Sequence, residues 1–288
     1  MRGIGTAIRW LRVCSVISLL VAATNSSAQA QGSGDPNPGA VTFTGGFDFA
    51  NAYFFRGFPQ DDTGVVMWPY ADLGFTLFSG DGVFKSAGVN VGMWNSLHTG
   101  SAGSDGPSGK LWYESDFYAG VGLGLAKGTS LNVLYTAYTS PNGLFGTVKE
   151  MSFRLSVDDT GPLGRAAVRP YILLAQEIEG QADGGEFEGT YLEFGISPGY
   201  ATSRAVLTVP LKVGLSLSNY YEGLDGDETF GFFSVGGVVT VPLASTPTKF
   251  GSWNIHGGVE FLRLDDRNEA VFGDSSYLIG SIGIGLSY

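Results

Sequence analysis

The stretch Val41-Thr42-Phe43-Thr44-Gly45-Gly46-Phe47-Asp48-Phe49 alternates in character, with most of its apolar side chains at odd positions. Successive side chains of a β-strand point to opposite faces of a sheet, so this segment has one oily face and one polar face. The same alternation recurs along the chain, and no segment of useful length has the helical period. We therefore predict an all-β protein whose strands each present one apolar face.

Twelve such segments follow one another, separated by the turn-forming residues Gly, Pro, Asn and Asp. The connections alternate between long and mostly short, which places the long ones together at one end of an antiparallel sheet. An even strand count with long loops at one end and short turns at the other is typical of bacterial outer-membrane barrels. The predicted strands are residues 41–56, 65–78, 83–96, 110–125, 130–139, 148–157, 166–176, 189–200, 205–220, 229–242, 250–264 and 276–288.

The composition agrees with a membrane-embedded barrel and excludes other classes of protein. Of the 288 residues, 45 are Gly, 43% are hydrophobic and only 15% are charged, which is not the profile of a disordered chain. Acidic residues outnumber basic ones by 27 to 16, so a nucleic-acid partner is not expected. Beyond the N-terminal segment, no apolar run reaches the roughly 18 residues that span a bilayer as a helix.

The N-terminus has the features of a cleaved signal peptide. Three arginines and an apolar stretch over 13–23 precede Ala28-Gln29-Ala30, a small-x-small cleavage pattern. A short transmembrane anchor is the alternative. We predict a signal peptide at 1–30, a short periplasmic leader at 31–40 and an outer-membrane β-barrel at 41–288. The removed segment contains the one cysteine, so no disulfide is expected.

Charged side chains within the predicted strands lie at the alternate positions that form the polar face, here called the polar parity. A charge facing lipid near the membrane midplane costs about 2–4 kcal/mol, so a barrel keeps its charges in the lumen. A soluble β-sandwich also alternates, but its outer face would be far more charged. The polar parity carries seven carboxylates and three bases, or four bases if Arg56 is included. An open lumen would therefore prefer cations. The predicted channel-lining residues are Asp48, Asp72, Glu114, Asp116, Glu150, Arg154, Arg169, Glu193, Lys212, His256 and Glu260.

Aromatic, glycine and proline positions add detail to this picture. Aromatic side chains gather at both ends of the predicted strands, as in the two girdles that mark membrane interfaces. Several inward-facing glycines, Gly92 and Gly122 among them, either leave room for water or ease strand curvature. Five prolines lie within the predicted strands, where they cannot donate to the ladder, and Pro210 is the least compatible with it.

Two stretches resemble known sequence signals. Residues 277–288 alternate and end on Tyr288, which resembles the C-terminal strand signal of outer-membrane proteins and implies insertion by the barrel-assembly machinery. Ala52-Tyr53-Phe54-Phe55-Arg56-Gly57-Phe58-Pro59-Gln60-Asp61-Asp62 resembles the Tyr-x-Phe-Arg-Gly-x-x-Gln signature of the TorF-like family of outer-membrane porins. Residues 114–120 and 135–141 resemble middle strands of that family. The resemblance covers residues 41–145 and implies a largely uncharacterised transport barrel without catalytic residues.

The sequence offers little for catalysis. It has no nucleophile elbow, phosphate loop or paired-His metal helix, so we predict no enzyme activity, no cofactor and no bound metal in the lumen. We expect His98 to be a solvated loop residue and His256 to be a lumen side chain with a hydrogen-bond partner. An outer-membrane phospholipase would need a lipid-facing Ser-His-Asn set, and His256 and Asn254 face the lumen by parity. A lipid-modifying enzyme is therefore a distant alternative.

The long loops are strongly acidic. They form either a solvated outer surface or binding sites for calcium or magnesium, which could also bridge to lipopolysaccharide phosphates. The candidate cation ligands are Asp225, Asp227, Glu228, Asp265 and Asp266.

We thus expect a transmembrane antiparallel up-and-down barrel that acts as a passive diffusion channel for small cationic or neutral solutes. The first alternative is a non-conducting structural or adhesive barrel, whose lumen is closed by salt bridges from Arg154, Arg169 and Lys212. The expected surroundings are outer-membrane lipid and lipopolysaccharide.

Overall fold

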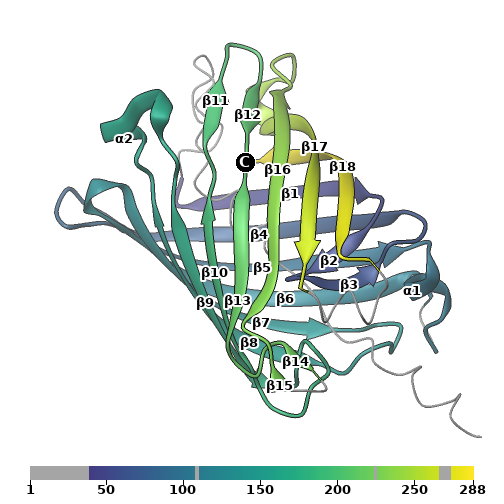
Figure 1. Cartoon of the computed structure of the whole chain (residues 1–288). Helices are drawn as coiled ribbons and strands as arrows, with labels where there is room; N and C mark the ends of the chain where they lie inside the picture. Colours follow the sequence, from purple (N-terminus) through teal and green to yellow (C-terminus); the bar gives the residue numbers. More distant parts are fainter. Residues whose placement is uncertain (1–38, 108–109, 224–225, 266–273) are drawn as a thin grey trace, which may run out of the picture.

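The chain folds into a closed antiparallel β-barrel of twelve strands (Figure 1). Each barrel strand pairs with its neighbours in the sequence, and β1 (Val41–Ala50) pairs with β18 (Ser276–Ser287), so the sheet has no free edge. This confirms the predicted up-and-down barrel. The computed structural model describes residues 39–107, 110–223, 226–265 and 274–288. The other barrel strands are β4 (Val66–Ser79), β5 (Phe84–His98), β6 (Trp112–Leu125), β7 (Thr129–Thr139), β8 (Val148–Val157), β9 (Tyr171–Glu179), β10 (Thr190–Ile196), β13 (Leu211–Ser218), β16 (Phe230–Pro242) and β17 (Ser252–Leu264).

Prolines divide two of the predicted strands without breaking the barrel. The predicted strand 189–200 consists of β10 and β11 (Gly199–Ala201), and 205–220 consists of β12 (Val206–Thr208) and β13. The carbonyl oxygens of Pro198 and Pro210 still accept backbone hydrogen bonds of 2.9 and 2.8 Å from neighbouring strands. A proline removes a donor and keeps its acceptor, so the ladder continues on one side.

The outer surface of the barrel is a broad apolar band. Large hydrophobic side chains on one parity of the strands are exposed, which a water-soluble monomer avoids and lipid favours. This band agrees with the predicted lipid face. It includes Phe49, Leu73, Phe75, Val91, Met93, Phe117, Val121, Phe153, Leu155, Ile172, Leu174, Phe194, Leu207, Val239, Ile255, Val259, Leu278, Ile282 and Ile284.

The two ends of the barrel differ, as the connection lengths predict. The end with the short connections, here the turn end, has α2 (Thr160–Leu163), β11 and β12 (Figure 1). The opposite, loop end has α1 (Ser101–Ser104), β14 (Glu222–Gly223) and β15 (Gly226–Asp227). Of the described helices, none is both long and apolar enough to cross a bilayer. The short 3-10 helices are η1 (Ala126–Gly128), η2 (Gly164–Ala166) and η3 (Thr248–Phe250).

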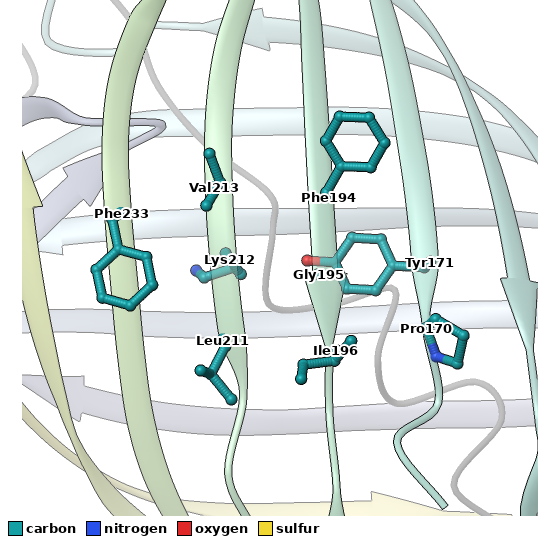
Figure 2. Close-up of a pocket in the computed structure, with 9 residues that line it drawn as sticks. All are labelled: Pro170, Tyr171, Phe194, Gly195, Ile196, Leu211, Lys212, Val213 and Phe233. Atoms are coloured by element: carbon teal, nitrogen blue, oxygen red, sulfur yellow. The ribbon is translucent and has the colours of Figure 1, made fainter.

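Some inward-facing glycines serve as sockets for aromatic rings. A Cβ atom at Gly195 would overlap the ring of Tyr171, and one at Gly92 would overlap the ring of Tyr118. Figure 2 shows Tyr171 crossing Gly195, beside a shallow depression whose rim includes the apolar side chain of Phe194. Of the two readings left open for these glycines, room for water does not apply at Gly92, because the ring of Tyr118 fills that space.

The first predicted strand differs from the structure. Residues 41–56 do not form one strand, because β1 ends at Ala50 and residues 53–61 form a separate hairpin of β2 (Tyr53–Phe55) and β3 (Phe58–Asp61). The two turn residues, Arg56 and Gly57, have φ values of 43° and 89°. Positive φ at both central residues is the geometry of the type I′ turn that favours two-residue hairpins.

Candidate functional site

The lumen of the barrel has two unlike halves. In the half next to the loop end, Glu114, Asp116 and Tyr191 are all 0% exposed. In the half next to the turn end, the side chain of His256 remains 23% exposed, and that of its partner Asp48, on the loop side of β1, remains 21% exposed. The loop half is therefore filled with protein, whereas the turn half is accessible to water.

The loop half is filled by the β2–β3 hairpin, residues 53–61, which we call the plug hairpin (Figure 1). Its side chains contact inward-facing groups from strands all around the barrel, which is possible only from inside the lumen. The phenol of Tyr53 donates a hydrogen bond of 3.1 Å to Glu114. The other barrel residues that the plug hairpin reaches include Trp68, Trp94, Tyr138, Glu150 and Tyr191.

Arg56 at the tip of the plug hairpin makes the strongest anchor. Its two terminal nitrogens donate to the two carboxylate oxygens of Glu150 over 2.6 and 2.8 Å, and one also donates to Tyr220 over 2.7 Å. The guanidinium lies 4.2 Å from the ring centre of Tyr191. Burial alone lowers the pKa of Arg56, but the charge of Glu150 raises it well above the ordinary value. This buried, bidentate ion pair joins the plug hairpin to β8.

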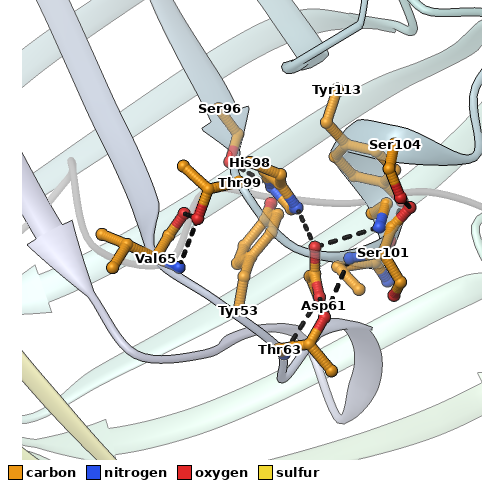
Figure 3. A network of polar contacts seen from close by, with 12 residues as sticks. Tyr53, Asp61, Thr63, Val65, Ser96, His98, Thr99, Ser101, Ser104 and Tyr113 are labelled. Carbon is orange, nitrogen blue, oxygen red and sulfur yellow. Dashed lines mark hydrogen bonds and ion pairs between the residues drawn. The ribbon is translucent and has the colours of Figure 1, made fainter.

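A second anchor lies at the other end of the plug hairpin (Figure 3). Asp61 accepts a hydrogen bond of 3.1 Å from Nδ1 of His98, whose Nε2 lies 2.7 Å from the hydroxyl of Ser96. Asp61 also accepts from the hydroxyl and backbone N–H of Thr63 and from the backbone N–H of Ala102. Burial alone raises the pKa of Asp61, but the bonds from His98 and Thr63 outweigh it and lower the pKa below 3.8.

The position of His98 corrects the sequence prediction. It was expected in a solvated loop, but it is the last residue of β5 and is 0% exposed. Its burial depends on Asp61, 37 residues away, and on the ring of Tyr113, whose centre is 4.4 Å from the imidazole. Local sequence gives no signal for contacts of this kind.

The Ser96–His98–Asp61 chain has the connectivity of a hydrolase relay but not its accessibility. Ser96 is 0% exposed, and its hydroxyl oxygen also accepts a hydrogen bond of 3.0 Å from the indole of Trp68. A nucleophile must reach its substrate, and this oxygen is covered on all sides in the described conformation. This series of hydrogen bonds is consistent with a structural link between the plug hairpin and the barrel wall.

The turn half contains polar pairs that water can reach. His256 lies 2.8 Å from Asp48 and 2.9 Å from Asn254, which confirms the predicted lumen histidine with a hydrogen-bond partner. Asn90 donates to Asp72 over 2.6 Å.

The alternative of a lumen closed by salt bridges named three bases, and one of them forms an ion pair with a described residue. Lys212 pairs with Glu260 over 3.1 Å, but neither Arg154 nor Arg169 forms an ion pair with any residue that the structure describes. Arg169 precedes β9 at the turn end, and its guanidinium donates to the carbonyl of Ser197. The plug hairpin, instead of ion pairs across the wall, fills the loop half of the lumen.

Glu193 of β10 and Arg154 of β8 lie further along the lumen wall. Glu193 is 0% exposed and accepts bonds of 2.6 Å from Tyr171 and from Tyr191. The guanidinium of Arg154 stacks 3.5 Å from the centre of the Tyr171 ring. Together with the groups named above, these account for all eleven predicted lumen residues.

The candidate cation ligands in the loops do not converge in the described structure. Asp225 and Asp266 lie outside the described residues. Asp227 accepts hydrogen bonds from Ser216 and from the backbone of Tyr221, and Asp265 is buried. The backbone N–H of Glu228 donates to the carbonyl of Tyr221. Within the described ranges, no three His, Cys, Asp or Glu side chains gather as a metal site.

Sequence reasoning missed three residues around the plug hairpin. Tyr220 accepts from Arg56, and the hydroxyl of Tyr221 donates to the Arg56 carbonyl. Glu177 lies just beyond the predicted strand 166–176, but it is in β9 and accepts backbone hydrogen bonds from Ala182 and Gly189. The adjacent tyrosines were the available signal, although they also fit an aromatic girdle.

Comparisons with known proteins show similar shapes at low identity. No protein-family model and no curated protein matches the chain. The translocator domain of the autotransporter NalP from Neisseria meningitidis is 12% identical, with a TM-score of 0.41 over 87% of this chain and 89% of that one. A NanC porin is 12% identical, with a TM-score of 0.38 over 86% and 99%. Outer membrane phospholipase A from Escherichia coli is 11% identical, with a TM-score of 0.40 over 85% and 92%.

Proposed function

We propose that this chain is an outer-membrane channel for the passive diffusion of small cationic or neutral solutes, and that the plug hairpin closes it in the described conformation. The observation that carries the proposal is the polar interior. A barrel that served only as a scaffold could fill its lumen with apolar side chains, whereas the inward-facing strand residues of this one include seven carboxylates, two bases and a histidine, the plug-tip arginine apart.

The outer surface supports an outer-membrane location. An apolar band around a closed barrel suits a bilayer, and outer-membrane lipid and lipopolysaccharide are the proposed surroundings. Residues 1–30 are proposed to be a signal peptide, with insertion by the barrel-assembly machinery. The resemblance to the TorF-like porins supports the same proposal, because its most specific residues are those of the plug hairpin.

Cation preference is proposed for the open state. In the closed state Arg56 neutralises Glu150, and Glu114 and Asp116 are buried. Withdrawal of the plug hairpin would remove this arginine and expose the three carboxylates to the aqueous path. Rings of Asp and Glu favour cations in a pore.

A non-conducting barrel is the second candidate, and the depth of plug burial favours it. Tyr53, Phe55 and Arg56 are each under 5% exposed, as in a permanent core. An enzyme is not proposed, because the buried serine near His98 lacks substrate access and His256 has no serine among its hydrogen-bond partners.

Single-channel recording of the refolded full chain in a planar bilayer tests the proposal. The matched variant replaces residues 53–61 with a flexible Gly-Ser linker of the same length. We expect brief or rare openings from the wild type, long openings from the variant, and a reversal potential that indicates cations in a salt gradient. A folded variant that stays silent would reject the channel and favour the structural barrel.

A further inference from the structure

Arg154 is a buried cation that has no anionic partner among the described residues. It is 9% exposed, and no carboxylate among the described residues lies within ion-pair distance of it. Its Nε atom donates to Ser156 over 3.3 Å, and neither terminal nitrogen donates to a described residue. An arginine that is more than nine-tenths buried normally has an anionic partner, because a desolvated charge without one is costly.

The surrounding groups orient this guanidinium instead of neutralising it. The ring of Tyr171 covers one of its faces at 3.5 Å, and the hydroxyl of Tyr171 is turned to Glu193. Glu193 accepts from two phenols, and no ion pair joins it to Arg154 in the described structure. Stacking covers one face of the guanidinium and leaves its two terminal nitrogens, with their parallel N–H donors, without a hydrogen bond to a described residue.

Asn132 stands beside Arg154 with a free amide. The two residues are direct partners across β7 and β8, which puts their Cβ atoms roughly 4.5–5.5 Å apart on the lumen face. No hydrogen bond joins the Asn132 side chain to any described residue. An amide donor next to a guanidinium fork extends the row of donors that a single carboxylate could meet.

The neighbouring wall leaves room for the rest of a ligand. In the register of the sheet, Gly88 pairs with Gly122, and Gly122 pairs with Asn132. A Cβ atom at Gly122 would meet only the side-chain oxygen of Asn132, at 3.0 Å. Neither strand carries a side chain at these two register positions, although a Cβ atom at Gly88 would already meet the carbonyl oxygen of Phe75, at 2.9 Å.

We propose that Arg154 and Asn132 bind the carboxylate group of a small solute in the turn half of the lumen. The guanidinium fork matches the planar geometry of a carboxylate, and a single unpaired positive charge suits a monoanionic group. The body of the solute lies over the bare wall at Gly88 and Gly122. The site needs only water access to the turn half, so it does not depend on whether the barrel conducts.

Saturation-transfer NMR on the refolded full chain in detergent tests this site with two probes of equal shape. Lactate has the carboxylate, and lactamide is its neutral counterpart. We expect saturation transfer to the lactate methyl group that exceeds the lactamide signal about fivefold or more. Equal signals from the two probes would overturn the proposal.

Variants locate the binding. Arg154→Gln is expected to reduce the lactate signal about fivefold or more, Asn132→Ala to reduce it about twofold, and Arg204→Gln, at an exposed turn, to leave it unchanged. If Arg154→Gln fails to fold, Asn132→Ala and the two-probe comparison on the wild type still decide the matter. A full lactate signal from folded Arg154→Gln would overturn the proposal. These readouts are separate from conductance, so loss of the channel proposal leaves them intact.

Discussion

Replacing Arg56 with Met is expected to release the plug hairpin. The change leaves Glu150, which is 2% exposed, without the cation that contacts both of its oxygens at 2.6 and 2.8 Å. Removing one partner of a buried ion pair costs about 3–5 kcal/mol, because the remaining charge stays desolvated. That cost applies to the docked state alone, since Glu150 meets water when the hairpin leaves.

The docking equilibrium should therefore shift by roughly two to four orders of magnitude, at about 1.4 kcal/mol per factor of ten. Single-channel recording measures the shift as an increase in the fraction of time spent open. The double variant Arg56→Met with Glu150→Gln should close again in part, because it has no unpaired buried charge. Arg204→Met is the matched control, since it removes an exposed arginine at the turn end.

The reasoning fails if Arg56→Met folds and gates like the wild type while the hairpin-replacement variant conducts freely. That pair of results would mean that the hairpin closes the lumen but the ion pair does not hold it there. The aromatic contacts of Tyr53 and Phe58 would then be the next anchors to remove.

Three further changes test other parts of the structure. Gly195→Ala should destabilise the barrel by about 1–3 kcal/mol in urea unfolding from lipid vesicles, because the new methyl group overlaps an aromatic ring, whereas Gly237→Ala meets nothing within 4 Å and should be nearly neutral. Asp61→Asn should lower thermal stability by a constant amount at neutral pH, and the difference should shrink as the pH falls below 3.8, because a lowered pKa stabilises the fold only while the carboxylate is ionised. Phe153→Arg on the exposed face should cost about 2–4 kcal/mol in the same unfolding assay, and Thr44→Arg on the lumen face should cost far less; equal costs would contradict the assigned lipid face.

The strands and their faces could be predicted from sequence because both are local properties. A period of two follows from strand geometry, and the lipid contact imposes it on each strand independently. Even Pro210, the least compatible residue, lies at a gap between two short strands that stay in the ladder. Strand ends were less predictable, because turns and strands share many residue types.

The plug hairpin could not be predicted, for two physical reasons. Residues 53–55 are three consecutive aromatic residues, which suit a continuing strand as well as a separate hairpin, so local composition does not separate the two. The turn also departs from the usual signal, since type I′ turns favour Asn-Gly or Asp-Gly and this one has Arg56-Gly57. The positive φ of Arg56 is maintained by tertiary contacts with Glu150 and Tyr220.

Parity also gives no information about the position of a residue along the barrel axis. That position decides whether a lumen carboxylate is exposed to water or buried. Counted by face, the lumen is acidic, but Glu114, Asp116, Glu150 and Glu193 are no more than 2% exposed. The carboxylates that water reaches are Asp48, Asp72 and Glu260, and the last of these is paired with Lys212. In the closed state the aqueous part of the lumen is thus close to neutral. The four buried carboxylates lie in the part of the lumen that the plug hairpin fills, and the tip of that hairpin is an arginine. The carboxylates that would select cations in the proposed open pore therefore also attract the plug hairpin that closes it.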